Sequence, residues 1–365
     1  MAMHGGFVGA ILLLAVALCS QTPVQGHNAG SMPSFASLFT NIAGARQAAY
    51  NLKDSEGQQM ACLHVVEGSS DPYIGLYQSQ VGSEFQVRAA VSHDLFTWTF
   101  VRTLLPNADM PFPFTVKENG WIVVAHEQWM NAGSQLPSRL GFKLYYNASM
   151  LLAGQYFNSY VAPLSVGRDT QLEGTPSIYS ADLVMRHGLY MLDLAMGFHF
   201  NDPQHVDQVA QGQLTSFGPT VVSPQWAPSL DTAYDDVFIR LGAIGNIGQR
   251  GNGALQGQRF LVQEANIGKM PPTIWQDWRV WLYVLAPTEP LPPTGAGTAY
   301  QLSPVTPGNS TAFGNPAIAV VPCPSAVRAG AGAGMCMYTT YFIFSQGAGP
   351  GEAGPVAFLN PLPAL

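Results

Sequence analysis

The stretch from Leu172 to Ser180, Leu-Glu-Gly-Thr-Pro-Ser-Ile-Tyr-Ser, places one acid, Glu173, at the Gly- and Pro-marked start of an apolar strand. A close echo lies at 314–319, Gly-Asn-Pro-Ala-Ile-Ala. A looser echo lies at 109–116, where an acid and two prolines precede Phe114. One device that recurs along a chain predicts an internally repeated fold.

Short apolar or alternating runs, broken by turn residues, make up most of the chain after residue 57. They fall into five sets of roughly four strands, which begin near residues 62, 112, 173, 237 and 317. The pattern predicts an all-β fold, a five-bladed β-propeller with four-stranded antiparallel blades. We expect a single propeller domain over 58–365, after a leader at 27–57 with a short helix near 35–49. A β-sandwich is the alternative, although the repeated sets are long for one.

The first 26 residues have the build of a secretory signal peptide. An apolar run from Phe7 to Leu18 precedes a polar stretch, and Val24 and Gly26 are the small residues expected before a cleavage site. The alternative, a membrane anchor, would need a longer apolar run of about 20 residues. We therefore expect a secreted, extracellular protein with no membrane span after signal removal.

The charge of the chain limits its partners. Only 10% of its residues are charged and the net charge is −7, so broad electrostatic attraction to nucleic acid is missing. An uncharged carbohydrate would not be repelled. The segment from His199 to Asp207 is rich in polar ligands, but its spacing matches no firm metal pattern. We predict no metal and no cofactor.

The secretory route favours a disulfide and glycosylation. Cys323 and Cys336 flank a Gly/Ala-rich loop and are expected to face each other across a hairpin, which leaves Cys62 as a buried thiol. Pairing of Cys62 with either of the other two is the open alternative. Asn147 and Asn309 begin Asn-x-Ser/Thr sequences and are candidate glycosylation sites.

Acids near the starts of the innermost strands would converge at one mouth of a propeller. We predict Glu173, Asp109 and Asp54 as catalytic carboxylates, and Asp236 as a substrate-binding residue. Glycoside hydrolysis needs such a group, because one carboxyl donates a proton while another activates water or attacks the sugar. The competing interpretation is that acids lie in turns because turns favour them.

Two further residues are candidates for substrate binding. Arg250 lies in the glycine-rich stretch 242–253, which lacks the pattern of a nucleotide loop and is expected to connect two strands. Trp129 lies beside a predicted loop, where its ring would stack on a sugar. The alternative is that Trp129 fills space between blades.

The chain resembles the five-bladed β-propeller glycosidases, which include arabinanases, β-xylosidases, arabinofuranosidases, levansucrases and invertases. Three segments carry the resemblance: the turn at 92–98, Ser-His-Asp-Leu-Phe-Thr-Trp, the Glu-Gly-Thr-Pro at 173–176, and the Gly-Leu-Tyr-Met-Leu at 188–192. The resemblance implies that Glu173 is the general acid and that Asp109 tunes and orients it. Members usually carry an Asp-Pro before the first inner strand. Here 60–64, Met-Ala-Cys-Leu-His, has no acid, and Asp54 is the nearest substitute.

Two classes of function remain open from the sequence. The first is a secreted glycoside hydrolase that acts on polysaccharide or oligosaccharide. The second is a non-catalytic carbohydrate-binding or structural propeller of the cell surface, favoured by the missing acid of the first blade.

Overall fold

The computed structural model describes residues 32–362, apart from 167–170, 187, 202–207, 220–222, 232, 234–235, 238–246, 256, 269–274, 287, 291–292 and 328–333. The expected signal peptide lies outside these residues. The described chain is all-β, as predicted, and its labelled helical elements are two short α-helices and two 3₁₀ turns. The helices are α1 (Met32–Thr40) and α2 (Ala148–Leu152), and the turns are η1 (Trp275–Asp277) and η2 (Ser345–Gly347). No described helix is long and apolar enough to cross a membrane.

The strands form antiparallel sets that follow one another along the chain. The first sheet contains β2 (Ala61–Val65), β3 (Tyr73–Val81), β4 (Glu84–Ser92) and β5 (Thr99–Pro106). An eight-stranded sheet contains β6 (Ala108–Thr115), β7 (Ile122–Asn131), β8 (Ser134–Tyr145) and β9 (Asn158–Val161), and then β10 (Leu172–Arg186), β11 (Leu189–Asn201), β12 (Gln208–Phe217) and β13 (Gln225–Leu230). Its two antiparallel halves are joined by a parallel bridge between Ser138 and Leu172.

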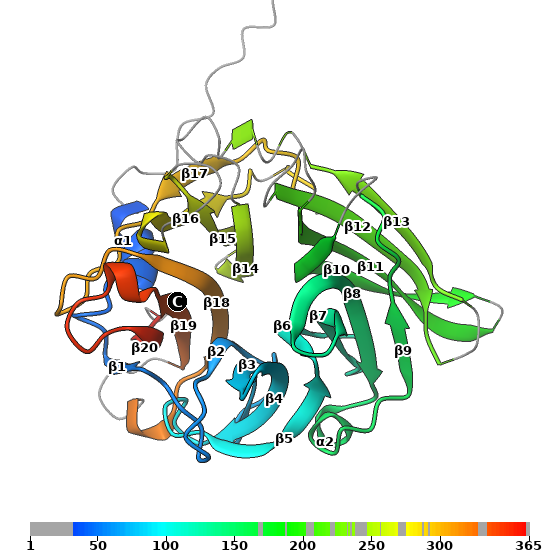
Figure 1. Ribbon diagram of the computed structural model, residues 1–365, viewed down its shortest axis with the longest axis horizontal. Helices are drawn as coiled ribbons and strands as arrows, with labels where there is room; N and C mark the ends of the chain where they lie inside the picture. The colour runs from blue at the N-terminus through cyan, green and yellow to red at the C-terminus, as the bar shows by residue number, and fades with distance from the viewer. Residues whose placement is uncertain are drawn as a thin grey trace, which may run out of the picture.

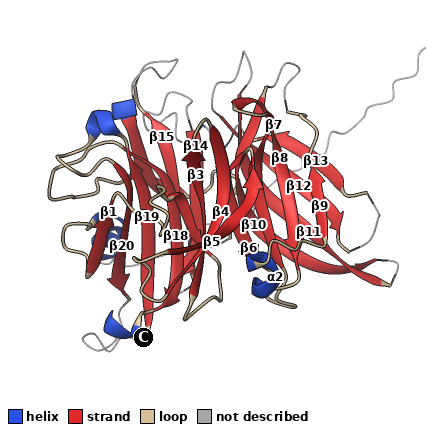
Figure 2. Cartoon of the chain, turned by 60° about the horizontal axis from the view of Figure 1, so that its bottom comes forward, coloured by secondary structure: helices blue, strands red, loops and turns tan. Residues whose placement is uncertain are grey.

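The remaining strands form two further sheets. One contains β14 (Ile247–Leu255), β15 (Gln258–Asn266), β16 (Trp278–Val284) and β17 (Thr298–Gln301). The other contains β18 (Phe313–Pro322), β19 (Met335–Ile343), β20 (Gly354–Pro361) and β1 (Gln47–Tyr50). The sets stand around a common centre with β2, β6, β10, β14 and β18 innermost (Figure 1). Seen from the side, the sheets stand next to one another and loops join them at both ends (Figure 2).

The beginning and the end of the described chain share one sheet. Strand β1 pairs along β20, from Gln47 opposite Leu359 to Tyr50 opposite Val356, so the expected leader supplies an edge strand to the last set. The helix expected near 35–49 forms only as far as Thr40. The hydrogen bonds offered by the edge of β20 favour an extended chain over the second part of that range.

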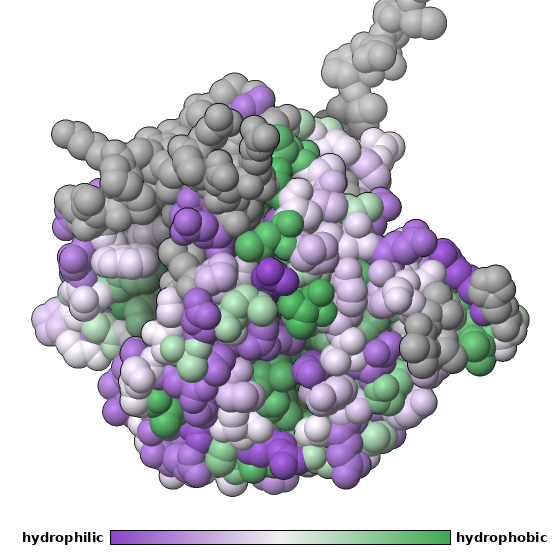
Figure 3. All heavy atoms as spheres, turned by 45° about the vertical axis from the view of Figure 1, so that its right-hand side comes forward, coloured by the Kyte–Doolittle hydropathy of each residue, from purple (hydrophilic) through white to green (hydrophobic). Residues whose placement is uncertain are grey.

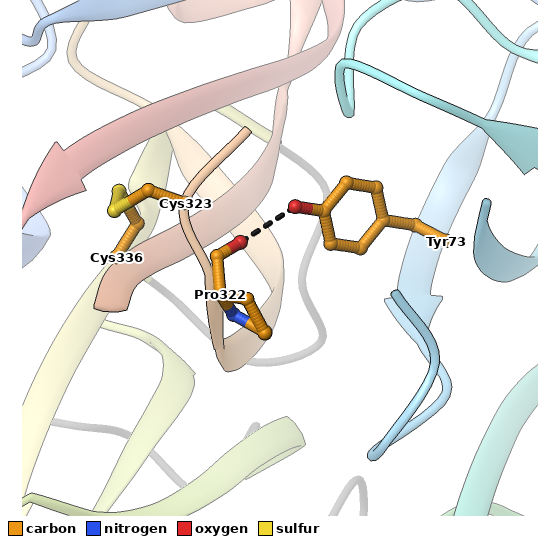
Figure 4. The surroundings of a disulfide bond; sticks show 4 residues. All are labelled: Tyr73, Pro322, Cys323 and Cys336. Carbon is orange, nitrogen blue, oxygen red and sulfur yellow. Dashed lines mark hydrogen bonds between the residues drawn. A yellow bond between two sulfur atoms is a disulfide. The ribbon is translucent and has the colours of Figure 1, made fainter. Parts of the chain in front are cut away.

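A hydrogen bond joins the last set to the first: the Tyr73 hydroxyl donates to the Pro322 carbonyl at 2.6 Å (Figure 4). Next to it, within the last set, a disulfide joins Cys323 to Cys336 across the ends of β18 and β19. Cys62 is buried and lies outside this disulfide.

Apolar side chains fill the spaces between neighbouring sheets. Tyr77 and Trp98 of the first set pack with Tyr338 of the last in one buried cluster. Phe142 and Phe198 belong to another cluster, which joins the two halves of the eight-stranded sheet. On the face shown in Figure 3, polar and apolar described residues are intermixed. The fold is therefore held by contacts between sheets, which position the innermost strands.

Candidate active site

The innermost strands share an irregularity at their starts. The pairing with the second strand of the set slips between Ala61 and His64, Asp109 and Phe112, Gly174 and Ser177, Ile247 and Arg250, and Gly314 and Ala317. In four of these strands, the residue at which the slip begins has a positive φ: Cys62 51°, Met110 47°, Thr175 48° and Asn315 48°. Such bulges turn a strand locally and are frequent beside active sites. The repeated Gly/Pro-marked motifs therefore correspond to one repeated backbone shape.

Asp109 and Glu127 form a buried pair of carboxylates. They lie opposite each other in β6 and β7, with exposed fractions of 3% and 1%. Burial and then the charge of Glu127 raise the pKa of Asp109 well above its usual range, while the nearby Trp129 indole acts in the opposite direction. Because two like charges are costly when they are buried together, one carboxyl group of the pair favours keeping its proton.

Glu173 lies at the start of β10 and is fully buried. Its Oε1 accepts hydrogen bonds from the backbone amides of Ser165 at 2.8 Å and Val166 at 2.9 Å. Its Oε2 makes no hydrogen bond of ordinary geometry with the described residues. Burial raises the pKa of Glu173, although the bonds to Ser165 and Val166 and the charge of Arg139 oppose that rise. A carboxyl in this environment holds its proton more readily than an exposed one.

Glycine at 174 brings the second and third sets into close contact. A Cβ at Gly174 would lie 1.9 Å from Oε2 of Glu127 and 2.4 Å from its Cδ. Any larger residue would collide with the buried carboxyl group. The glycine of the Glu-Gly-Thr-Pro segment thus lets the Glu127 side chain reach the strand that carries Glu173.

Glu264 on β15 plays a similar part between the last two sets. It is 5% exposed, and its Oε2 accepts the backbone amide of Asn315 at 2.6 Å. A Cβ at Gly314 would lie 2.5 Å from the same oxygen. In the first set, Gln78 Oε1 likewise accepts the amide of Met110 at 2.8 Å. Second-strand side chains therefore hold the bulged start of the following set.

The buried thiol of Cys62 lies among these acids. Its Sγ is 3.4 Å from Sδ of Met110. Burial raises the pKa of the thiol, and the charges of Glu264, Asp109 and Glu127 raise it further. Carboxylates of the second and fourth sets therefore act on the start of β2, where the sequence itself has no acid.

Asp54 has a different environment from the one expected of a catalytic base. Its carboxylate accepts hydrogen bonds from the Tyr77 hydroxyl at 2.5 Å and Arg88 Nη1 at 2.7 Å, and from the amides of Glu56 and Gln58 at 2.9 Å each. Its backbone bridges to Trp98, next to the outermost strand of the first set. The structure thus places Asp54 in a network of hydrogen bonds and an ion pair with Tyr77 and Arg88 of the first set.

The other expected binding residues lie in varied places. Trp129 is 7% exposed, and its ring packs against that of Phe85 in a tilted arrangement, with 5.2 Å between ring centroids. It therefore fills space beside Asp109. Asp236 is exposed. Arg250 lies in β14 opposite Gln263.

The two candidate glycosylation residues are exposed. Asn147 caps α2, where its Oδ1 accepts the amide of Met150 at 3.0 Å. Asn309 lies in a turn with φ of 60°.

Sequence reasoning missed Glu127 and Glu264. Both lie in second strands, Ile122–Asn131 and Gln258–Asn266, where an apolar run and then one polar residue precede the Glu. Charged residues are rarely buried without a special reason, so a Glu that shares a strand with an apolar run was the available signal.

Comparison with known proteins places the fold. No protein-family profile matches the sequence, and no curated protein matches it either. Among solved structures, the chain is similar to an α-L-arabinofuranosidase from Lactobacillus brevis, with 10% identity and a TM-score of 0.52 over 83% of this chain and 90% of that one. It is also similar to an exo-β-1,3-galactanase from Clostridium thermocellum, with 13% identity and a TM-score of 0.52 over 87% of this chain and 63% of that one. The predicted resemblance to the propeller glycosidases is confirmed for the fold, at low sequence identity.

Proposed function

We propose that this protein is a secreted carbohydrate-active hydrolase built as a five-bladed propeller. In this proposal the eight-stranded sheet counts as two blades, since a bridge between Ser138 and Leu172 joins two complete antiparallel sets. Each blade then begins with an inner strand that carries the same irregularity. The Cys323–Cys336 disulfide suits an oxidising compartment, in keeping with a signal peptide at 1–26.

The chemistry rests on carboxylates at the starts of the inner strands. Hydrolysis of a glycosidic bond needs one protonated and one ionised carboxyl group. Glu173, with its raised pKa, is the proton donor, and the pair of Asp109 and Glu127 supplies the second carboxylate. The observation that carries the proposal is the contact of Glu127 with Gly174, which brings the pair to the strand of Glu173. The substrate is a neutral oligosaccharide or polysaccharide, of the kind named for the solved neighbours.

A second candidate function follows from burial. Asp109, Glu127 and Glu173 have exposed fractions of 3%, 1% and 0%, and the chain at Ser165 and Val166 bonds to Glu173. Substrate would reach Glu173 only after this chain segment moves. A non-catalytic carbohydrate-binding propeller needs no such movement.

Amide substitutions separate the two. Glu173→Gln and Glu127→Gln keep the size of each side chain and remove its acid. We expect each to lower the release of reducing ends from arabinan, xylan or β-1,3-galactan by about a hundredfold or more, the usual contribution of a positioned acid or base. Glu118→Gln, at an exposed turn residue, is the matched control. Full activity of Glu173→Gln would rule out its role as the acid, and glycan binding without any turnover by the unaltered protein would favour the second candidate.

A further inference from the structure

Trp275 presents a large aromatic surface to solvent. It begins η1 and is 54% exposed, whereas Trp is usually highly buried. Its ring lies nearly parallel to that of Phe344, at 5.0 Å between centroids and 27° between planes, and to that of Trp278, at 6.2 Å and 18°. We call these three rings the aromatic platform. The Phe344 and Trp278 rings thus stack against Trp275, and the large exposed fraction of Trp275 leaves part of its flat ring open to solvent.

The aromatic platform is held in place before any ligand arrives. The backbone amide of Trp275 donates to Oε1 of Gln346 at 2.8 Å. Gln346 belongs to η2, and the turns η1 and η2 pack against each other. Because the rings are already ordered, a ligand that stacks on them loses little binding energy to ordering the protein.

A hollow beside the aromatic platform has the chemistry of a site for a neutral polar ligand. It has a volume of about 340 Å³, within the range of small-ligand sites, and Trp275 and Phe344 line it. Gln59 and Ser345 add polar groups, and none of the lining residues is charged. A flat apolar surface with uncharged donors and acceptors suits a pyranose ring, which has an apolar C–H face and a rim of hydroxyl groups.

The aromatic platform lies at the same end of the sheets as the carboxylates. A Cβ at Gly314 would lie 2.5 Å from Oε2 of Glu264 and 2.7 Å from the Phe344 ring. Gly314 is at the start of the inner strand β18, opposite Phe342. The platform therefore continues outward from Glu264.

We infer that the aromatic platform is a carbohydrate-binding subsite, in which a pyranose residue of a neutral oligosaccharide stacks on Trp275. This inference rests on the carbohydrate class of the proposed function, but it does not require hydrolysis. The subsite would bind one part of a chain while the carboxylates lie next to another part.

The test is direct binding of xylo-, galacto-, manno- and gluco-oligosaccharides, measured by calorimetry and by tryptophan fluorescence. The Glu173→Gln protein is used so that turnover does not consume the ligand. We expect at least one of the four to bind and to change the fluorescence, and Trp275→Ala to weaken that binding by about tenfold or more. Trp275→Phe, which keeps a stacking ring, recovers most of the affinity. Tyr300→Ala removes an aromatic side chain that is 44% exposed on β17, and should leave the binding unchanged.

The outcomes are distinct from those of the hydrolysis test. If Trp275→Ala binds as tightly as its parent, or if none of the oligosaccharides binds, the subsite is overturned even where hydrolysis is observed. If binding depends on Trp275 but the unaltered protein releases no reducing ends, the subsite stands and the proposed hydrolysis fails. If Trp275→Ala does not fold, Trp275→Leu takes its place and is measured by calorimetry: binding about tenfold weaker than that of Trp275→Phe supports the subsite, and equal binding overturns it.

Discussion

Replacing Asp54 by alanine should destabilise the protein without removing a catalytic group. The change would leave the Tyr77 hydroxyl and the Arg88 guanidinium without a carboxylate that is 2.5 and 2.7 Å away. Arg88 is 4% exposed and would be left as a buried cation, although Glu56 still contacts it. Removing one member of a buried ion pair costs about 3–5 kcal/mol. Because Glu56 remains, we expect about 3 kcal/mol of the free energy of unfolding to be lost.

Urea unfolding followed by far-ultraviolet circular dichroism measures this loss. The midpoint for Asp54→Ala should fall while the slope m stays that of the unaltered protein. The double variant Asp54→Ala/Arg88→Met should recover part of the stability, because it also removes the cation left behind. Glu118→Ala, at an exposed position, should change the free energy of unfolding by no more than about 0.5 kcal/mol.

Activity or glycan binding decides the interpretation. Below the unfolding midpoint, Asp54→Ala should act on or bind carbohydrate as the unaltered protein does. If Asp54→Asn instead unfolds at the same urea concentration as the unaltered protein and has lost all turnover, Asp54 is catalytic and the structural role argued from its hydrogen bonds is wrong.

Three other changes have expected outcomes. Gly174→Ala should cost about 1–3 kcal/mol in urea unfolding, since its Cβ meets a buried carboxylate, whereas Gly334→Ala, with open space around its Cβ, should be nearly neutral; equal costs would contradict the close contact. The raised pKa of Asp109 means that the folded state keeps a proton that the unfolded chain loses above about pH 4, so its contribution to stability falls as pH rises through the folded pKa. Asp109→Asn should flatten that decline in unfolding free energy, and an unchanged pH dependence would exclude Asp109 as its source. Replacing Cys323 and Cys336 by serine opens a loop with a sequence separation of 13 and should cost about 3 kcal/mol; a thermal midpoint equal to that of the oxidised protein would show that the disulfide adds nothing.

The sequence determined the class of fold and its repetition. Recurrent starts such as Glu-Gly-Thr-Pro at 173–176 and Gly-Asn-Pro at 314–316 mark bulges with positive φ at Thr175 and Asn315. Backbone conformations of this kind are set locally, so the glycine, proline and asparagine residues at these starts indicate where they occur. Alternating runs likewise reveal strands, because successive side chains point to opposite faces of a sheet.

The tertiary structure alone decided which acids come together. Asp54, an acid before the first inner strand, accepts hydrogen bonds from Arg88 and Tyr77 of its own set. Glu127 and Glu264, in the middle of second strands, reach the inner strands of the following sets. Partners of this kind lie across the spaces between sheets and far apart in the chain. Their pairing depends on how closely two backbones approach, and spacing along one sequence carries no record of that distance.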